Sequence, residues 1–266
     1  MGKTEIQGKE AGPVGGGGGG CPPTSAASVG KDHRGGQRSI IEEKRQPDNV
    51  SDLFRARVGD FRNEILHGRA GDDCCWTGAT FRDVSLAVVQ ISQNLQNYGC
   101  RAGSRIGVCG DNSPQWMELF YACSFFSGIC VAVDRNCKGP DLASAIEHTN
   151  MEILVTCSSK VGDVISAIND NKEESDRAWQ LHTIVVWGCD DPFKLRLYNQ
   201  AVASRGISLI GWEEFLDSTH MITHPDTPPS ASDPHVIFYS AGQKATVVHH
   251  GALVASIYSL HLLMRG

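Results

Sequence analysis

Several features that would point to a class of protein are missing from this sequence. No run of basic residues is longer than two, and 24 lysines and arginines stand against 30 aspartates and glutamates, so a nucleic acid partner is not expected. The longest apolar stretch, 117–133, is interrupted by Glu118 and Gly128 and is too short to span a membrane. The first ten residues carry two lysines and two glutamates and no apolar segment, so no secretory signal is expected. These absences predict a soluble cytoplasmic chain, with peripheral membrane association left open.

Motifs for common catalytic and metal sites are also missing. The ten cysteines include no C-x-x-C pair, and the chain has no G-x-x-x-x-G-K-[ST], G-x-G-x-x-G or G-x-S-x-G segment. His249 and His250 are adjacent, so their side chains point to different sides of a helix or strand and make a poor metal pair. The sequence therefore predicts no metal site and no catalytic nucleophile. Several cysteines lie inside apolar runs and are expected to be reduced, buried thiols.

Composition divides the chain near residue 47. Residues 1–47 contain six consecutive glycines, Gly15 to Gly20, and almost no large apolar residues, so they cannot offset their ordering entropy by burial. We expect a disordered glycine-rich tail there. Residues 48–266 are richer in apolar residues and are expected to form a folded domain.

Alternating strand and helix patterns fill this second part. Apolar periodicity predicts helices over 50–62, 81–98, 114–127, 141–149, 161–168, 212–216 and 252–264. Short apolar runs predict strands over 105–110, 129–133, 153–156, 183–187, 207–210 and 235–239, with a short strand pair around Gly78. The β–α order predicts an α/β fold with a mainly parallel sheet and flanking helices. Ligands of such sheets bind at the carboxyl ends of the strands.

The segment that carries most information follows the last predicted strand. Small residues, Ser240, Ala241 and Gly242, come directly after Tyr239, and Lys244 follows shortly after them. Small residues let backbone N–H groups approach a phosphate, and a lysine adds a positive charge. The same residues also suit an ordinary glycine turn with an exposed lysine, so the pattern alone leaves both readings open.

The order of motifs along residues 50–266 resembles the N-terminal part of the adenylate-forming (AMP-binding) acyl-CoA synthetases, and is most similar to the long-chain fatty acid type. Phe238-Tyr239-Ser240-Ala241-Gly242 resembles the start of the family's phosphate loop, Tyr-Thr-Ser-Gly-Thr-Thr-Gly-x-Pro-Lys-Gly. The other similar stretches, in order, are 80–84, 99–108, 111–116, 146–155, 181–185, 212–215 and 247–253. These stretches occur in the family's order and spacing.

The resemblance implies a ligase. A fatty acid carboxylate would attack the α-phosphate of ATP, with Mg²⁺ offsetting the charge, and coenzyme A would then displace AMP. Ser240, Ala241, Gly242 and Lys244 would be the ATP-binding residues. Here, however, only Gln243 separates Gly242 from Lys244, where the family has five residues. Two threonines and a glycine of the loop are among those missing.

The resemblance therefore implies a partial AMP-binding domain over 48–266, and a fragment of a long-chain fatty acid–CoA ligase that is inactive alone. A second reading is a non-catalytic, degenerate homologue that acts as a binding module, with a full-length homologue as a partner. A third is an unrelated doubly wound nucleotide-binding protein, which would need a complete phosphate loop.

Overall fold

In a computed structural model, residues 47–70, 76–170, 179–217, 228–240 and 244–264 are described. The predicted glycine-rich tail over 1–47 falls almost wholly outside these residues and stays a prediction.

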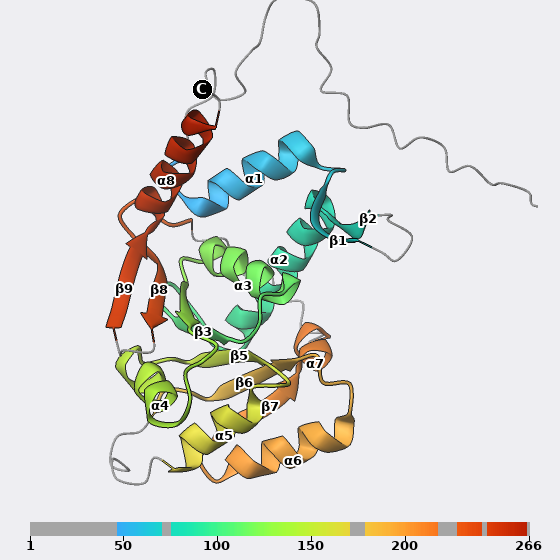
Figure 1. Cartoon of the computed structure of the whole chain (residues 1–266), viewed down its shortest axis with the longest axis vertical. Helices are drawn as coiled ribbons and strands as arrows, with labels where there is room; N and C mark the ends of the chain where they lie inside the picture. The colour runs from blue at the N-terminus through green and yellow to red at the C-terminus, as the bar shows by residue number, and fades with distance from the viewer. Residues whose placement is uncertain (1–46, 71–75, 171–178, 218–227, 241–243, 265–266) are drawn as a thin grey trace, which may run out of the picture. The chain divides into compact units, whose positions relative to one another are not determined.

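A seven-stranded sheet runs through the centre of the chain (Figure 1). Its order is β7-β6-β5-β3-β4-β8-β9, and every neighbouring pair is parallel except β8 with β9. The strands are β3 (Arg105–Cys109), β4 (Ile129–Val133), β5 (Ile153–Cys157), β6 (Thr183–Trp187), β7 (Ser208–Gly211), β8 (Pro234–Ser240) and β9 (Lys244–His249). The predicted α/β class with a mainly parallel sheet is confirmed.

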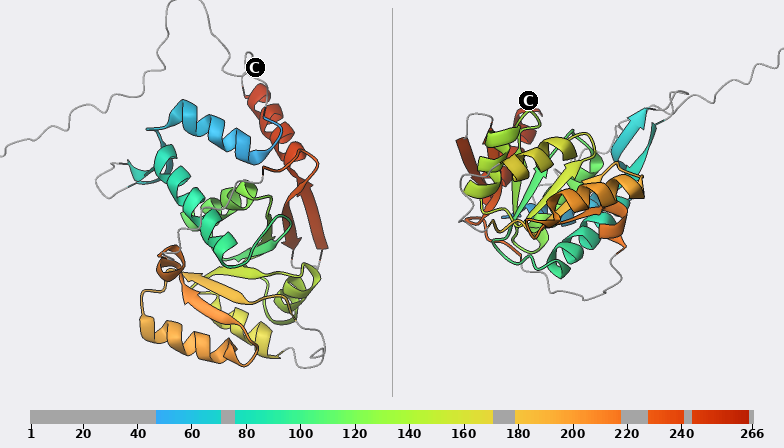
Figure 2. Two further views of the ribbon diagram at one scale, coloured as in Figure 1. Left: turned by 180° about the vertical axis from the view of Figure 1, so that it is seen from behind. Right: turned by 90° about the horizontal axis from the view of Figure 1, so that it is seen from below.

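Helices cover both faces of this sheet (Figures 1 and 2). One core lies under α1 (Val50–Phe61), α2 (Phe81–Asn97), α3 (Pro114–Phe125) and α7 (Trp212–Leu216). The opposite core lies under α4 (Gly139–His148), α5 (Val161–Asp170) and α6 (Pro192–Ala203). The last described helix is α8 (His250–Leu263). The central strands are buried from both sides, which is why they read as continuous apolar runs rather than alternating ones.

Helix starts follow local chemistry. Thr80 caps α2 in a reciprocal capping box with Asp83, whose carboxylate accepts hydrogen bonds from the Thr80 backbone N–H and hydroxyl at 2.9 and 2.7 Å. Ser113 caps α3, where Pro114 fills the first turn. These signals lie in the sequence, so both helix starts were predictable.

One prediction about strands is wrong. Gly78 does not divide a strand pair; it lies within β2 (Trp76–Thr80), which pairs antiparallel with β1 (Ile65–Ala70). A Cβ at Gly78 would meet the backbone oxygen of His67. Glycine is therefore present because the two backbones approach closely, and not because the chain turns.

Gly59 gives a test of the α1 assignment. It lies inside the helix with nothing within 4 Å of a built Cβ. We expect Gly59→Ala to raise the free energy of unfolding by about 0.5–1 kcal/mol, because alanine loses less backbone entropy in a helix. Urea denaturation followed by circular dichroism measures the change.

The matched control for this prediction is Gly99→Ala. Gly99 has a positive φ of 95° just after α2, so the same substitution should destabilise the chain there. A loss of stability in Gly59→Ala would contradict the helical assignment of residues 50–61.

Candidate functional site

The helices that follow β3, β4 and β5 do not all pack on the same face of the sheet. After β3, α3 packs in the first core, whereas α4 and α5, which follow β4 and β5, pack in the second. Helices on opposite faces leave a crevice at such a switch point, where ligands of open α/β sheets usually bind. A ligand site is therefore expected at this edge of the sheet.

Polar contacts within the loop after β4, and from this loop to its neighbours, hold it in place. The Asp134 carboxylate accepts a hydrogen bond from the Asn136 backbone N–H at 2.8 Å, and Arg135 pairs with Asp111 at 2.6 Å. The backbone N–H of Asp134 donates to the carbonyl of Tyr239 at 3.1 Å. The last contact joins this loop to the end of β8, so the predicted phosphate loop begins at the same edge as the switch point.

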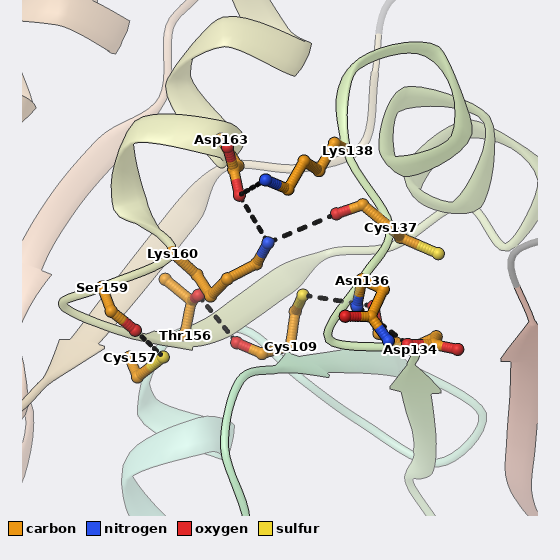
Figure 3. A network of polar contacts seen from close by, with 10 residues as sticks. All are labelled: Cys109, Asp134, Asn136, Cys137, Lys138, Thr156, Cys157, Ser159, Lys160 and Asp163. Carbon is orange, nitrogen blue, oxygen red and sulfur yellow. Dashed lines mark hydrogen bonds and ion pairs between the residues drawn. The ribbon is translucent and has the colours of Figure 1, made fainter.

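A lysine ties this loop to the start of α5 (Figure 3). Lys160 has a side chain only 12% exposed; it forms an ion pair with Asp163, and its Nζ donates to the carbonyl of Cys137 at 3.5 Å. Lys160 lowers the pKa of the Asp163 carboxyl through a hydrogen bond and its charge. Lys138 lies 4.0 Å from the same carboxylate. The positive charge of Lys160 is thus balanced by Asp163, and the side chain has a structural role: it joins the loop after β4 to the start of α5.

The thiol of Cys109, at the end of β3, is not placed for reaction as a nucleophile. Cys109 is fully buried, and its burial raises the pKa of the thiol to about 12. A protonated thiol is a poor nucleophile and a poor metal ligand. Of the seven cysteines in the described ranges, six are buried, in agreement with the predicted burial. Within those ranges no three His, Cys, Asp or Glu side chains gather as a metal site.

The two described residues of the predicted phosphate loop lie at the end of β8 and the start of β9. Ser240 is the last residue of β8 and Lys244 the first of β9, and the two are paired across the hairpin. Lys244 is exposed. Ala241 and Gly242 lie outside the described residues. The structure thus places the backbones of Ser240 and Lys244 opposite each other, where the end of β8 pairs with the start of β9.

Tyr239 makes contacts that the sequence analysis did not predict. Its ring is 2% exposed, and its hydroxyl lies 3.0 Å from Nδ1 of His148, at the end of α4. Burial raises the pKa of the Tyr239 hydroxyl. With the bond from Asp134 to its carbonyl, Tyr239 is held through both its backbone and its ring directly before Ser240.

Little in the sequence indicates that His148 and Tyr239 are in contact. His148 and Tyr239 each lie in a segment that resembles a family motif, but the two are 91 residues apart. Spacing along the chain does not bring them together; only the pairing of β4 with β8 does.

In the parts of the chain that the structure describes, no helix combines the length and apolar character needed to cross a bilayer.

Solved structures with a similar fold include a CoA ligase and one domain of a carboxylic acid reductase. A putative long-chain-fatty-acid CoA ligase from Rhodopseudomonas palustris aligns over 82% of this chain and 48% of its own, with a TM-score of 0.61 and 16% identity. The adenylation domain of a carboxylic acid reductase from Segniliparus rugosus, solved with AMP and a carboxylic acid, covers 76% of this chain and 36% of its own, with a TM-score of 0.62 and 10% identity. At these identities the likeness shows the fold.

The curated proteins with similar sequences include long chain acyl-CoA synthetases. Long chain acyl-CoA synthetase 1 from Arabidopsis thaliana is 24% identical over 242 residues, which is 85% of this chain and 35% of the relative. Long chain acyl-CoA synthetase 4 of the same plant is 21% identical over 245 residues, 86% of this chain and 35% of that protein. This chain therefore spans about a third of the length of these relatives. Residues 71–265 match the profile of the AMP-binding enzymes, and with most of its length inside that match the chain belongs to the AMP-binding enzyme family.

Proposed function

We propose that this chain is part of an ATP-dependent long-chain fatty acid–CoA ligase. The long-chain acyl-CoA synthetases among its relatives support that substrate class. In such a reaction a fatty acid carboxylate displaces pyrophosphate from ATP to give an acyl-adenylate, and the thiol of coenzyme A then displaces AMP. Fatty acid, ATP with Mg²⁺, and coenzyme A are the ligands this proposal implies.

We further propose that residues 47–264 do not form the acyl-adenylate by themselves. The observation that carries this proposal is the pairing of Ser240 with Lys244, which leaves three residues to connect β8 and β9. The family's loop has four more residues at this position, including two threonines. Backbone N–H groups of a longer loop can surround a triphosphate, whereas a three-residue connection offers few donors. The residues present therefore do not fit a wrapped triphosphate, and no step of the reaction is assigned to them.

Ser240 and Lys244, with Ala241 and Gly242 between them, remain the proposed contacts for a phosphate group. Lys244 would act as a point charge and the Ser240 hydroxyl as a donor. The anchors of Tyr239 on His148 and Asp134 would hold the start of this turn in place. We expect weak phosphate binding, because one lysine and one hydroxyl make few charge-assisted bonds.

Pyrophosphate exchange tests the proposal. The purified chain, incubated with ATP, Mg²⁺, a long-chain fatty acid and labelled pyrophosphate, is expected to give exchange at background. Long chain acyl-CoA synthetase 1 from Arabidopsis thaliana, assayed in parallel, provides the positive control. Circular dichroism of the same sample shows that the chain is folded. Exchange clearly above background that depends on the fatty acid would overturn the claim that this chain lacks adenylation activity.

A second candidate function is a non-catalytic binding module, which pairs with a full-length homologue. Two separate buried cores within the described residues favour it, because they can stabilise the domain without a complete ligand site. Several apolar side chains of α8 remain largely exposed, among them Leu260 at 59% and Leu263 at 80%. Exposed apolar patches mark interaction surfaces or aggregation sites. Gel filtration separates the two cases: a discrete complex with the homologue supports the module, and aggregation of the chain alone and in the mixture opposes it.

A further inference from the structure

Two histidines are buried against each other where α1, α3, β8 and α8 meet. His235 is the second residue of β8 and His250 the first of α8, and both side chains are 0% exposed. Their ring centroids lie 4.4 Å apart with an interplanar angle of 34°. On its other side, His235 meets the ring of Phe120 edge-on at 4.3 Å. The pair is thus enclosed by an aromatic side chain of α3 and by the helix starts around it.

Hydrogen bonding fixes the protonation state of His250. The backbone N–H of Val50, the first residue of α1, donates to Nδ1 of His250 at 3.2 Å. An imidazole nitrogen that accepts a hydrogen bond carries no proton, so the proton of neutral His250 is on Nε2. That Nε2, and both ring nitrogens of His235, have no hydrogen-bond partner among the described residues. Three buried polar atoms without partners are unusual, since such atoms are almost always paired.

The charged groups around the pair do little to compensate a positive charge. Asp233 lies in the turn before β8, where its carboxylate accepts a hydrogen bond from the Ser230 backbone N–H at 2.8 Å. His249, at the end of β9, has its Nδ1 2.7 Å from the carbonyl of Ser232. α3 presents the uncharged ring of Phe120. On α1, Asp52 accepts a hydrogen bond from the side chain of Asn49. The remaining acidic groups on or beside the neighbouring elements are Asp48, just before α1, Asp60, which pairs with Arg57 inside α1 at 3.0 Å, and Glu118 on α3. Arg55, also on α1, lies over the ring of Phe125.

Burial dominates the titration of both rings. Burial, with a smaller contribution from the neighbouring His250, lowers the pKa of His235 to about 3. Burial also lowers the pKa of His250 to about 4, where Asp233 acts in the opposite direction and His249 in the same one. Free histidine titrates near pH 6.5, so the packed pair binds fewer protons than the same pair released to water at about pH 4 to 6.5. Its contribution to stability is complete above about pH 6.5 and is lost as the pH falls toward about 4.

We propose that His235 and His250 form an acid-sensitive clasp that holds α1 on α8. A proton on Nδ1 of His250 removes the acceptor of the Val50 N–H. A charge on either ring is then buried with no ion pair to an acidic side chain among the described residues, although the more distant Asp233 favours the charge on His250. Acid therefore drives the rings out of their shared site and releases the start of α1. The stack of Phe54 on Tyr121, at 4.4 Å, is apolar and does not respond to acid, so the release begins at the first turn of α1.

Hydrogen exchange tests the clasp. Labelling times are corrected for the intrinsic effect of pH, and peptides that cover α1 are compared with peptides that cover α6, on the opposite face of the sheet. Between about pH 7 and pH 4.5 we expect α1 peptides to lose protection about tenfold, with α6 peptides unchanged. Equal loss in α1 and α6 at the same pH would show general acid unfolding and overturn the proposal.

Variants separate the clasp from other acid effects. His235→Phe keeps a ring against Phe120, and His250→Gln keeps a side-chain acceptor for the Val50 N–H; neither residue titrates. The double variant is expected to retain α1 protection in acid. His182→Gln, at a histidine beside the hydroxyl of Thr183, is the matched control and should behave as the parent chain. Loss of α1 protection in the double variant at the parent's pH would overturn the proposal.

A direct titration covers the case in which the double variant fails to fold. Nuclear magnetic resonance of the parent chain follows each histidine ring, and two rings are expected to stay neutral down to about pH 5. Titration of all ten histidines near pH 6.5, with α1 still protected, would contradict the clasp.

Discussion

Replacing Phe215 with alanine is expected to lower the free energy of unfolding by about 3–5 kcal/mol. The ring is fully buried and lies 5.7 Å from Tyr98 and 5.6 Å from Trp212, measured between ring centroids. Its backbone carbonyl accepts a hydrogen bond from the Asn94 side chain at 2.9 Å. Phe215 therefore joins the short helix α7 to α2, and its removal leaves a cavity that these neighbours cannot fill. Urea denaturation followed by circular dichroism gives the value.

Phe193→Ala is the control for this result. Phe193 is 67% exposed at the start of α6, so the same truncation removes little buried surface and should change stability by no more than about 0.5 kcal/mol. Equal losses in the two variants would mean that α7 is not packed on α2.

Gly110→Val is expected to cost about 1–3 kcal/mol. Gly110 follows β3 at the switch point, and a Cβ there would lie 2.8 Å from two carbons of the Trp187 ring and 2.9 Å from Sγ of Cys157. The indole is 7% exposed and Cys157 is equally buried, so neither neighbour can move away without disturbing the first core. A thermal unfolding curve should show a lower midpoint, and the near-ultraviolet signal of tryptophan should change.

The same substitution at Gly162 separates crowding from the effect of valine itself. Gly162 lies in the first turn of α5 with nothing within 4 Å of a built Cβ, so Gly162→Val should change stability by no more than about 0.5 kcal/mol. If both variants lost the same stability, close packing at Gly110 would not be the cause.

Much of the sheet could be predicted because its strands are buried on both faces. Runs such as Ile129–Val133 and Thr183–Trp187 are short and continuously apolar, and the helices between them carry clear starts. α6 was not predicted, although Asp191 accepts hydrogen bonds from the backbone N–H groups of Phe193 and Lys194 and so caps the helix. Its outer face displays Phe193 and Leu197, which blurs the apolar stripe.

Strands with little burial were harder to predict. β1 and β9 were both missed, because β1 is a short partner of β2 outside the main sheet, and β9 is an edge strand with five exposed residues. Among the described side chains of these two strands, only Leu66 and Val248 pack against the first core, and both are only partly buried, so little burial imposes alternation on either sequence. A strand of this kind is identified by its partner and not by its own residues.

The candidate site was predictable only in part. Ser240 and Lys244 were chosen from the sequence, and the hairpin pairs them. Contacts between distant parts of the chain were not predictable: His148 with Tyr239, Asp134 with the carbonyl of Tyr239, and Val50 with His250. Each depends on the order of the strands in the sheet. Consecutive strands such as β4 and β5 lie on opposite sides of β3, and no periodic pattern in the sequence indicates this order.

The bond between Val50 and His250 has a consequence for synthesis of the chain. The two residues are 200 positions apart, and ribosomes add about 5–20 residues per second. α1 therefore leaves the ribosome on the order of 10–40 s before the residue that holds its first turn has been made. During that interval the apolar side of this helix, including Phe54, is open to chaperones and to other nascent chains.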